Sequence, residues 1–378
     1  MSKRIAVLAV VSLVAAACSG STTSLPSADS SETGDTSTEA SNSPGVAAET
    51  GLEAELRVAA EELVGDVEGG GSFLIHREGE TAAVGVGNRN SNGDPITADT
   101  EFHVGSISKV FLATIVMQLA DEGTVDLDSP IRDYLPDLGI NGDPTVRQVL
   151  AHQSGFAEYT TESFFSSLAA NPTKIYSPDK VLATVADEPA GEPGAGFRYV
   201  NTNYIVLGQL IETLTEGTVD EALQARIAEP LGLTHTRFTV ADTTYSDNMA
   251  APWTVGIAGE PDFEYAALRS ASWAAGSLVS TPSDLQQFLE ALTSGELTSE
   301  SALEQMKPEP EEPYGLGVAL ADELGIDGRF FIGHGGAIPG YLAFMAIEPE
   351  TGTVFVMALN NDKVLANPDD FDTFVELL

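Results

Sequence analysis

The sequence predicts an α+β fold in which one antiparallel sheet, built from both termini of a large domain, is flanked by helices and carries an inserted, mainly helical lobe. Strand patterns occur near the start of this domain and again near its end, whereas helical patterns dominate the middle. The final strand patterns follow one another with tight turns, as in an antiparallel sheet. With 378 residues in the chain, the domain is placed at residues 51–378.

The domain begins with a helix, a hairpin and a second helix. Residues 52–64 carry apolar residues at helical spacing, which predicts an amphipathic helix. Residues 72–90 predict two strands joined by a tight turn at Gly79. A polar loop over 92–102 leads to a helix over 104–119 that is apolar on nearly every face, and a helix of this kind is buried.

The rest of the chain completes the helical lobe and then the sheet. Residues 121–200 mix short helical segments with Pro and Gly breaks. Two longer helices are expected over 202–217 and 218–232. The end of the sequence predicts four strands and a closing helix, at 313–320, 329–336, 340–349, 352–361 and 369–378.

The N-terminus has the features of an export signal. Lys3 and Arg4 precede an apolar stretch, residues 5–17, that is too short for a comfortable membrane span. Cys18 is the only cysteine, and its position predicts a lipoprotein-type signal over 1–18 with Cys18 as the lipid anchor. The alternative is an ordinary secretory signal cut near the preceding alanines. Either way we expect an exported protein, lipid-anchored on the outer face of a bacterial cell membrane or otherwise secreted.

Composition limits the possible partners. Residues 19–50 are rich in Ser, Thr and acidic residues and contain no aromatic residue, which predicts a disordered tether. The formal net charge is −40 at pH 7, so a polyanion such as nucleic acid would be repelled. We therefore expect no nucleic-acid partner and a membrane contact only through the N-terminal anchor. The sequence does not indicate an oligomeric state.

Ser106 and Lys109 are the first candidate catalytic residues. Three positions apart, they share one face of a helix, and Lys109 is the only charged residue between Val104 and Leu119. Burial without a partner lowers the pKa of a lysine, and a neutral amine can take the proton of a serine hydroxyl and make it a nucleophile. The alternative is a structural lysine paired with an acid that the sequence does not reveal.

The same spacing recurs at Ser177 and Lys180 in a different context. Pro178 follows the serine directly, and a capping serine followed by proline is typical of the start of a helix. Lys180 would then lie in a polar first turn. We therefore expect Ser177 and Lys180 to be structural.

A second motif contains Tyr199 and Asn201, the only Tyr-x-Asn of the chain. A tyrosine hydroxyl with a lowered pKa could move protons between the nucleophile and the leaving group. The amide of Asn201 could bind a substrate amide or Lys109. Alone, the motif would be interpreted as a core tyrosine and a turn asparagine.

A third motif, His334, Gly335, Gly336 and Ala337, lies on an expected strand. Glycines in a strand let a substrate approach the backbone closely. The backbone N–H of Ala337, together with that of Ser106, could stabilise an oxyanion. A histidine here would on its own be interpreted as structural.

In this order, the three motifs resemble those of the serine β-lactamase and penicillin-binding-protein superfamily, in particular the branch with class C β-lactamases, D-alanyl-D-alanine carboxypeptidases and related esterases. The resemblance covers about residues 52–378 and includes TEFHVGSISKVF, VRQVLAHQSGF, YVNTNYIVLG, EPLGLTHTRF, YGLGV and GHGGAIPGY. It implies a β-lactamase/transpeptidase-like fold. It also implies that Ser106 is the acylated nucleophile, Lys109 its base, Tyr199 the general acid/base and Asn201 a substrate contact.

His334, Gly335 and Gly336 stand where many members of that superfamily have Lys-Thr-Gly, so substrate contacts are expected there too. Histidine is mostly neutral at pH 7, whereas lysine offers a fixed charge to a substrate carboxylate. We therefore expect a serine hydrolase that forms an acyl-enzyme with an ester or a D-amino-acid peptide. The alternatives are a class C-like β-lactamase and a non-catalytic receptor for wall peptides or β-lactams on the same fold.

Other sequence features are interpreted as structural or coincidental. His152 and Ser154 of LAHQSGF are expected to support the site. Ser246-Asp247-Asn248 spells a motif of class A β-lactamases but follows Tyr-x-Asn, so we interpret it as coincidence. The absence of Gly-x-Ser-x-Gly argues against an α/β-hydrolase. No His-Glu-x-x-His or close His/Cys cluster is present, so no metal and no cofactor are expected.

Overall fold

The computed structural model describes residues 51–239, 246–253, 266–309, 312–321, 324, 326, 328–362, 364 and 372–378. The expected signal segment, the tether and Cys18 lie outside these residues. Within them, every helix is too short or too polar to cross a membrane.

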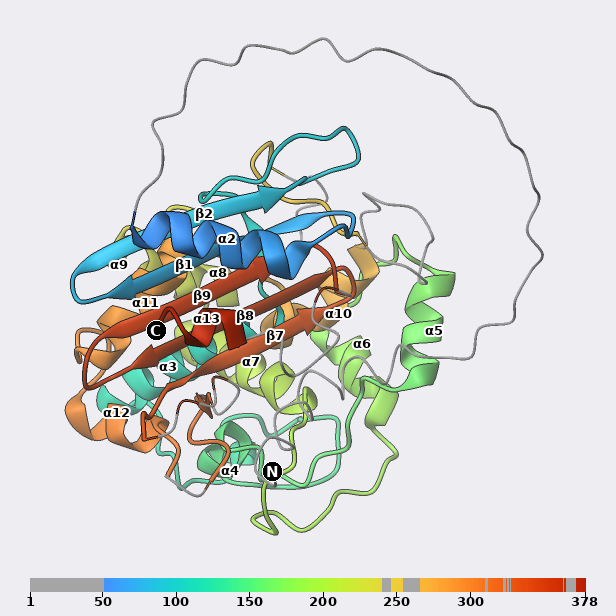
Figure 1. The fold of residues 1–378 in the computed structure, drawn as a ribbon. Coiled ribbons are helices and arrows are strands. Elements are labelled where there is room, and N and C mark those ends of the chain that lie inside the picture. Colours follow the sequence, from blue (N-terminus) through green and yellow to red (C-terminus); the bar gives the residue numbers. More distant parts are fainter. Residues whose placement is uncertain are drawn as a thin grey trace.

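One six-stranded antiparallel sheet joins the two ends of the domain (Figure 1). In spatial order its strands are β2 (Glu80–Gly87), β1 (Gly70–Arg77), β9 (Thr353–Leu359), β8 (Tyr341–Glu348), β7 (Ile332–Ile338) and β6 (Ala319–Leu320). The N-terminal hairpin therefore continues directly into the C-terminal strands through the β1–β9 pair. This arrangement confirms the predicted α+β fold class.

One face of the sheet is covered by elements from both ends of the domain (Figure 1). Helix α2 (Leu52–Val64) lies over β1 and β2, and α13 (Asp372–Val375) packs against α2. The rings of Phe73 and Phe374 stack with centroids 5.4 Å apart. A compact apolar core between sheet and helices therefore joins the two termini of the domain.

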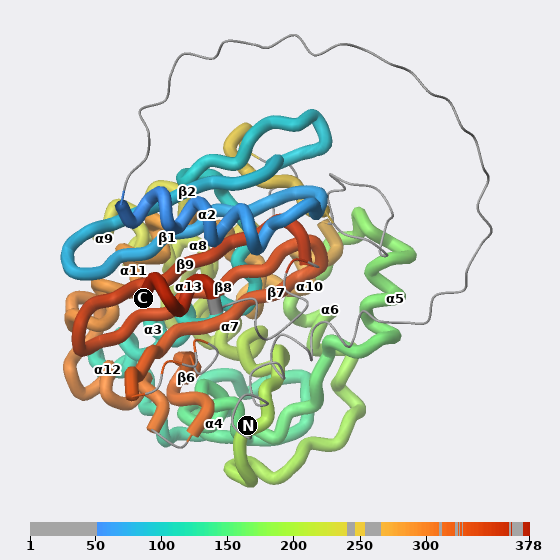
Figure 2. The backbone as a smooth tube through the Cα atoms, viewed as in Figure 1, coloured from blue at the N-terminus to red at the C-terminus, as the bar shows by residue number. Residues whose placement is uncertain are grey.

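The opposite face carries the helical lobe and the larger core (Figure 2). At its centre lie α3 (Ser108–Asp121), α7 (Thr202–Thr215), α10 (Ala266–Gly276) and α11 (Pro282–Thr293). Other described helices are α4 (Val146–Leu150), α5 (Glu162–Ala170), α6 (Pro178–Leu182), α8 (Val219–Leu223), α9 (Glu229–Leu231) and α12 (Glu300–Met306). As predicted, α3 is buried on nearly every face, and Ser177 caps α6 by accepting a hydrogen bond from the Lys180 backbone N–H.

Several elements differ from the sequence-based expectation, and α10, α11 and α12 lie where no individual helix was predicted. The helix expected over 218–232 is α8 and α9 joined by a π-helical turn, Gln224–Ala228. The strand expected over 313–320 is wrong for most of its length, because the Gly315 N–H bonds the Val318 carbonyl and turns the chain back before β6. A second, small sheet was not predicted; its strands are β3 (Phe102–His103), β5 (Leu278–Ser280) and β4 (Arg237–Phe238).

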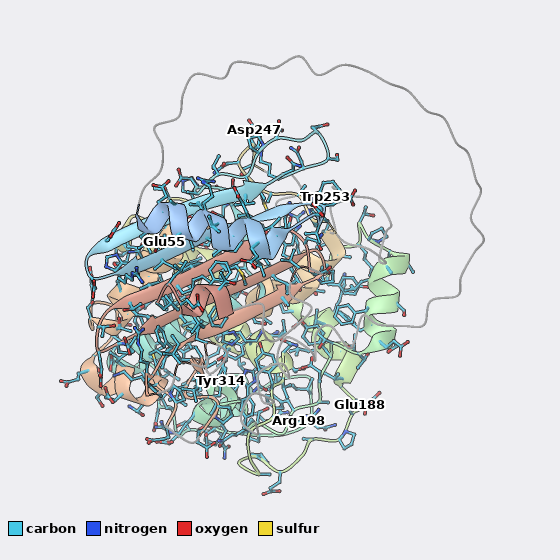
Figure 3. All side chains as sticks on the ribbon, in the orientation of Figure 1. Glu55, Glu188, Arg198, Asp247, Trp253 and Tyr314 are labelled. Atoms are coloured by element: carbon cyan, nitrogen blue, oxygen red, sulfur yellow. The ribbon has the colours of Figure 1, made fainter. Side chains whose placement is uncertain are left out.

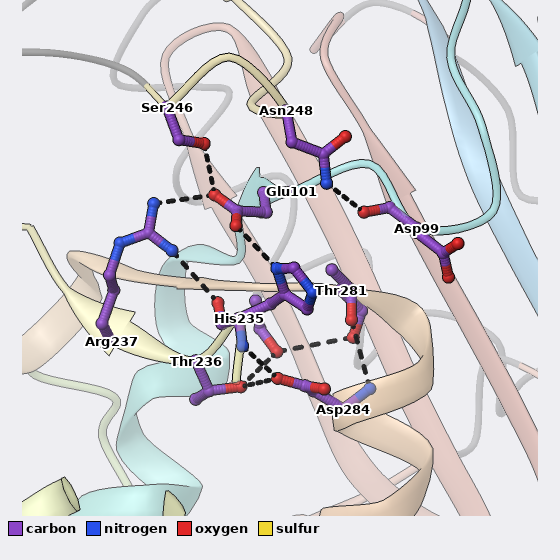
Figure 4. A network of polar contacts seen from close by, with 10 residues as sticks. Asp99, Glu101, His235, Thr236, Arg237, Ser246, Asn248, Thr281 and Asp284 are labelled. Atoms are coloured by element: carbon purple, nitrogen blue, oxygen red, sulfur yellow. Dashed lines mark hydrogen bonds and ion pairs between the residues drawn. The ribbon is translucent and has the colours of Figure 1, made fainter. Parts of the chain in front are cut away.

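A buried carboxylate joins this small sheet to a neighbouring loop (Figure 4). Glu101 accepts hydrogen bonds from Arg237 at 2.7 Å and from the Ser246 hydroxyl at 2.7 Å, and it lies 2.8 Å from His235 Nδ1. The Asn248 side chain donates to the Asp99 carbonyl at 2.6 Å. Ser246 and Asn248 thus hold a loop in place, which gives the Ser-Asp-Asn sequence a structural role.

Candidate active site

Ser106 and Lys109 meet at the N-terminal end of the buried helix. Ser106 lies in a 3₁₀ turn, Gly105–Ile107, that runs directly into α3, and Lys109 is the second residue of α3. Lys109 Nζ lies 2.9 Å from Ser106 Oγ. Lys109 is 0% exposed and Ser106 is 8% exposed, so the serine reaches the surface and the lysine stands behind it.

The surroundings of Lys109 favour its neutral form. Its hydrogen-bond partners among the described residues are uncharged: Ser106 Oγ and, at 2.7 Å, the Ala275 carbonyl. Burial lowers the pKa of Lys109 to about 7, although the Glu158 carboxylate opposes this shift. A neutral amine can donate to the Ala275 carbonyl and still accept a proton from Ser106. No acid pairs directly with Lys109 among these residues, contrary to the structural alternative.

Tyr199 precedes α7 and stands beside this pair. Its ring centroid is 5.0 Å from Lys109 Nζ, and its hydroxyl is buried without a hydrogen-bond partner among the described residues. Burial raises the pKa of Tyr199, and the neighbouring Ser106 hydroxyl offsets only part of the rise. The expectation of a lowered pKa is therefore wrong, because the buried site disfavours a phenolate. At neutral pH this hydroxyl is a proton donor.

Asn201 forms hydrogen bonds with Glu158 and Thr160 and none with Lys109. Its backbone N–H donates to Glu158 Oε2 at 2.6 Å, and its side chain donates to Thr160 Oγ1 at 3.2 Å. These bonds fasten the start of α7 to the chain at 158–160. The side chain still lines the cavity described below, so a substrate contact stays a prediction.

His152 and Ser154 support this arrangement from behind. His152 stacks on Tyr199 with ring centroids 4.3 Å apart, and its Nδ1 accepts the Val200 N–H at 3.0 Å. The Ser154 hydroxyl donates to Asn203 Oδ1 at 2.6 Å. Both residues are buried and hold the segment that carries Tyr199.

His334 lies on β7 and faces inward. Its Nε2 is 3.0 Å from the Tyr314 hydroxyl, and only 2% of the residue is exposed. Burial and then the nearby Lys109 charge lower the pKa of His334 to about 3, so the imidazole is neutral at pH 7. His334, Gly335 and Gly336 are not among the cavity-lining residues, so direct substrate contacts there stay a prediction.

The 3₁₀ turn that carries Ser106, here called the serine turn, and strand β7 approach each other at two glycines. A Cβ added at Gly105 would lie 2.7 Å from the Ala337 nitrogen, and one added at Gly336 would lie 3.0 Å from the Ser106 nitrogen. Gly105 also has a φ of 53°, which favours glycine. The backbone nitrogens of Ser106 and Ala337 are thereby brought to one place, as an oxyanion site requires.

A cavity of about 130 Å³ opens beside Ser106. Its described walls are Ser106, Glu158, Tyr159, Thr160, Phe164, Phe165, Leu168, Tyr199, Asn201, Leu268, Ala271, Ser272, Ala275, Gly276, Ala337, Ile338 and Pro339. Most of these side chains are apolar or aromatic. Glu158 is the only charged side chain among them, and none of them is a cation.

Three residues of the site were not predicted from the sequence. Glu158 lines the cavity, Tyr314 bonds His334, and Ala275 supplies the carbonyl for Lys109. Ala275 lies in the last turn of α10, where carbonyl groups lack partners within the helix. Glu158 had no sequence signal of its own, whereas Tyr314 lies within the quoted YGLGV.

Most of the domain is similar to known proteins. The family model described as Beta-lactamase matches residues 56–374. Penicillin-binding protein 4 of Amycolatopsis lactamdurans is 28% identical in an alignment 326 residues long that covers 78% of this chain and 81% of that protein.

Two solved structures have similar folds. The D-stereospecific amidohydrolase from a Streptomyces species superposes with a TM-score of 0.71 at 29% identity, over 82% of this chain and 94% of that one. The D-amino acid amidase from Ochrobactrum anthropi SV3, complexed with L-phenylalanine amide, superposes with a TM-score of 0.73 at 27% identity, over 86% and 97% of the two chains.

Proposed function

The chain belongs to the beta-lactamase family of serine hydrolases, and from this premise we propose that it hydrolyses amide or ester bonds of D-amino-acid derivatives through an acyl-enzyme on Ser106. The observation that carries the proposal is the 2.9 Å contact between Ser106 and a buried Lys109 whose pKa is lowered to about 7. Such a lysine is a competent base near neutral pH, which supports catalysis over a role as a silent receptor.

In the proposed acylation, Ser106 Oγ attacks the substrate carbonyl carbon while its proton passes to Lys109 Nζ. The backbone N–H groups of Ser106 and Ala337 donate to the oxygen as it becomes negative. When the carbon–nitrogen or carbon–oxygen bond breaks, Tyr199 gives its hydroxyl proton to the leaving group and regains one from Lys109. Water then attacks the acyl-enzyme by the reverse relay, and the acid product leaves.

The cavity favours an apolar acyl group without a carboxylate. Phe164, Phe165 and Leu168 offer an apolar wall, and the one charged wall residue, Glu158, is an acid. An ammonium would be attracted there, whereas a carboxylate would be repelled. Aminoacyl amides, esters and peptides therefore suit the cavity better than a β-lactam, whose carboxylate would find no cation among these walls. The similar D-amino acid amidase and D-stereospecific amidohydrolase support the same substrate class.

A panel of chromogenic substrates tests the proposal. We expect D-phenylalanine p-nitroanilide to be hydrolysed with a higher kcat/KM than its L-enantiomer and than a chromogenic cephalosporin. Ser106→Ala should abolish all turnover, while Ser177→Ala, the matched serine of the structural Ser-x-x-Lys, should retain it. Fastest turnover of the cephalosporin would support the β-lactamase alternative. Binding without turnover of any acyl substrate would support the receptor alternative.

We also propose that the protein is exported and held by Cys18 at the end of the 19–50 tether. The support is the short apolar segment before a single cysteine and the composition of the tether, which has one leucine and no aromatic residue. Mass spectrometry of the protein from membranes should show a diacylglyceryl group on Cys18, and Cys18→Ser should release it. Activity should survive proteolytic trimming to residue 50. Loss of activity on trimming would contradict the proposed domain boundary.

A further inference from the structure

A polar groove of about 870 Å³ lies on the other side of the wall that lines the cavity. The described residues that form it are Ala157, Glu158, Tyr159, Thr161, Ser163, Phe164, Ser167, Lys174, Tyr176, Lys180, Ala183, Thr184, Val185, Glu188, Pro189 and Arg198. Its volume is in the range of ligand sites, and hydroxyl groups from four Ser and Thr residues face it.

Three cations gather in this groove without acid partners. Lys180 and Arg198 form no side-chain hydrogen bond or ion pair with any described residue, and Lys174 has the Tyr176 ring as its neighbour, at 4.3 Å. The other lysine and arginine side chains that the structure describes each have an interaction partner, most often a carboxylate or a backbone carbonyl.

One exposed lysine without a partner is ordinary, but this cluster is not what the composition predicts. The chain has 57 acidic and 17 basic residues, so an exposed cation has many acids available to it. Glu158 and Glu188 also line the groove, yet neither forms an ion pair with the three cations. Figure 3 shows Arg198 and Glu188 near each other at this edge of the helical lobe.

The groove is tied to the candidate active site by shared chain segments. The cavity and the groove share the lining residues Glu158, Tyr159 and Phe164, so these residues separate the two. Arg198 lines the groove, and the next residue, Tyr199, lines the cavity. A substrate that extends past the cavity wall would therefore meet the three cations.

We propose that this groove is a subsite for a carboxylate-bearing peptide portion of the substrate, held by Lys174, Lys180 and Arg198. The inference rests on the proposed function. A peptide suits the lining better than a polyphosphate, because two acids and several hydroxyls stand among the cations and a strongly anionic polymer would be repelled. Carboxylates and backbone amides can use both the cations and the hydroxyl groups.

A binding assay tests the subsite without requiring turnover. The probes are the dansyl-labelled peptide amides Glu-Gly-D-Phe-Gly-Glu and Gln-Gly-D-Phe-Gly-Gln, measured by fluorescence anisotropy with the full-length Ser106→Ala protein. At low salt we expect the acidic peptide to bind roughly three- to tenfold more tightly, because each exposed charge pair contributes little and several act together. High salt should remove the advantage.

Variants identify the groove as the origin of this preference. In a Lys174→Gln, Lys180→Gln, Arg198→Gln triple variant, the ratio of the two Kd values should fall to about one, since the contributions of the three charge pairs are lost. Lys307→Gln removes a partly exposed charge, paired with Glu304 outside the groove, and should leave the ratio unchanged.

Equal binding of the two peptides, no binding of the acidic one, or an unchanged ratio in the triple variant overturns the subsite. If any of these occurs while D-phenylalanine p-nitroanilide is still hydrolysed by the wild-type protein, the subsite alone fails. If the p-nitroanilide is not hydrolysed, the proposed function fails independently of the binding result.

Discussion

Gly336 lies so close to Val104 that a Cβ added at position 336 would come within 1.9 Å of the Val104 carbonyl oxygen. A backbone atom cannot move out of such an overlap as the end of a flexible side chain can. β7 and the turn that carries Ser106 must therefore move apart. That movement would separate the Ser106 nitrogen from the Ala337 nitrogen. Gly105 and Gly336 therefore allow the close approach on which the geometry of the proposed oxyanion site depends.

Gly336→Ala should reduce kcat/KM about 100-fold, because a displacement of about 1 Å in a reacting group has effects of this size. Gly139→Ala is the matched control, since Gly139 has open space around its added Cβ and no positive φ. Steady-state kinetics with a p-nitroanilide would measure both variants. Unchanged kcat in a folded Gly336→Ala protein would show that the contact does not position the site.

Lys109→Arg should abolish acylation although it keeps the positive charge, because arginine stays protonated at any working pH. For the wild-type protein, kcat/KM should rise with pH through an inflection near the Lys109 pKa of about 7, since only the neutral amine can accept the Ser106 proton. A pH–rate profile and burst kinetics measure both effects. Near-normal acylation by Lys109→Arg would mean that Lys109 acts only as a cation.

Tyr199→Phe should lower kcat by about 10² to 10⁴, the usual contribution of a positioned proton donor. It should change the free energy of unfolding little, because the Tyr199 hydroxyl is buried without a described partner. Tyr159→Phe is the contrasting variant for stability. It should lower the free energy of unfolding, because the Tyr159 hydroxyl donates to the Ala271 carbonyl at 3.1 Å. Equal losses of kcat and stability in Tyr199→Phe would indicate a structural tyrosine.

Glu101→Gln should lower the free energy of unfolding at pH 7 by about 1–3 kcal/mol, since it weakens several bonds to one buried carboxylate. Burial raises the pKa of Glu101, but bonds from Arg237, His235 and Ser246 outweigh it and hold the pKa below its usual value. The wild-type contribution is thus present above the unfolded-state pKa and lost as pH falls through the lower folded-state pKa.

Urea titrations at several pH values measure this difference. The two proteins should converge in stability at acid pH. Glu304→Gln, at a surface ion pair with Lys307, is the control and should change the free energy of unfolding by less than about 1 kcal/mol. A constant gap between wild type and Glu101→Gln down to pH 3 would contradict the electrostatic origin.

The sequence was most informative where a pattern is local. The helix at 52–64, the hairpin at Gly79 and the buried α3 follow from periodicity and turn residues alone. The contact of Ser106 with Lys109 likewise follows from spacing within one turn of chain.

Contacts between distant segments could not be predicted from the sequence. Glu158, Ala275 and Tyr314 reach the site from separate loops and a helix end, and no periodicity marks them. The pKa of Tyr199 was expected to be lowered, but burial, which depends on tertiary packing, raises it. The π-helical turn at Gln224–Ala228 and the small β3–β5–β4 sheet also depend on tertiary context.

The pairing of β1 with β9 has a consequence for the order of events during synthesis. His76 pairs with Val354 and Gly71 with Leu359, so the first strand must wait for nearly the whole polypeptide before its second neighbour exists. Until then the nascent hairpin of β1 and β2 has an open hydrogen-bonding edge, which is a site for misassembly. A ribosome that stalls before residue 353 leaves a chain that cannot close its central sheet, and such contacts of long sequence separation form slowly.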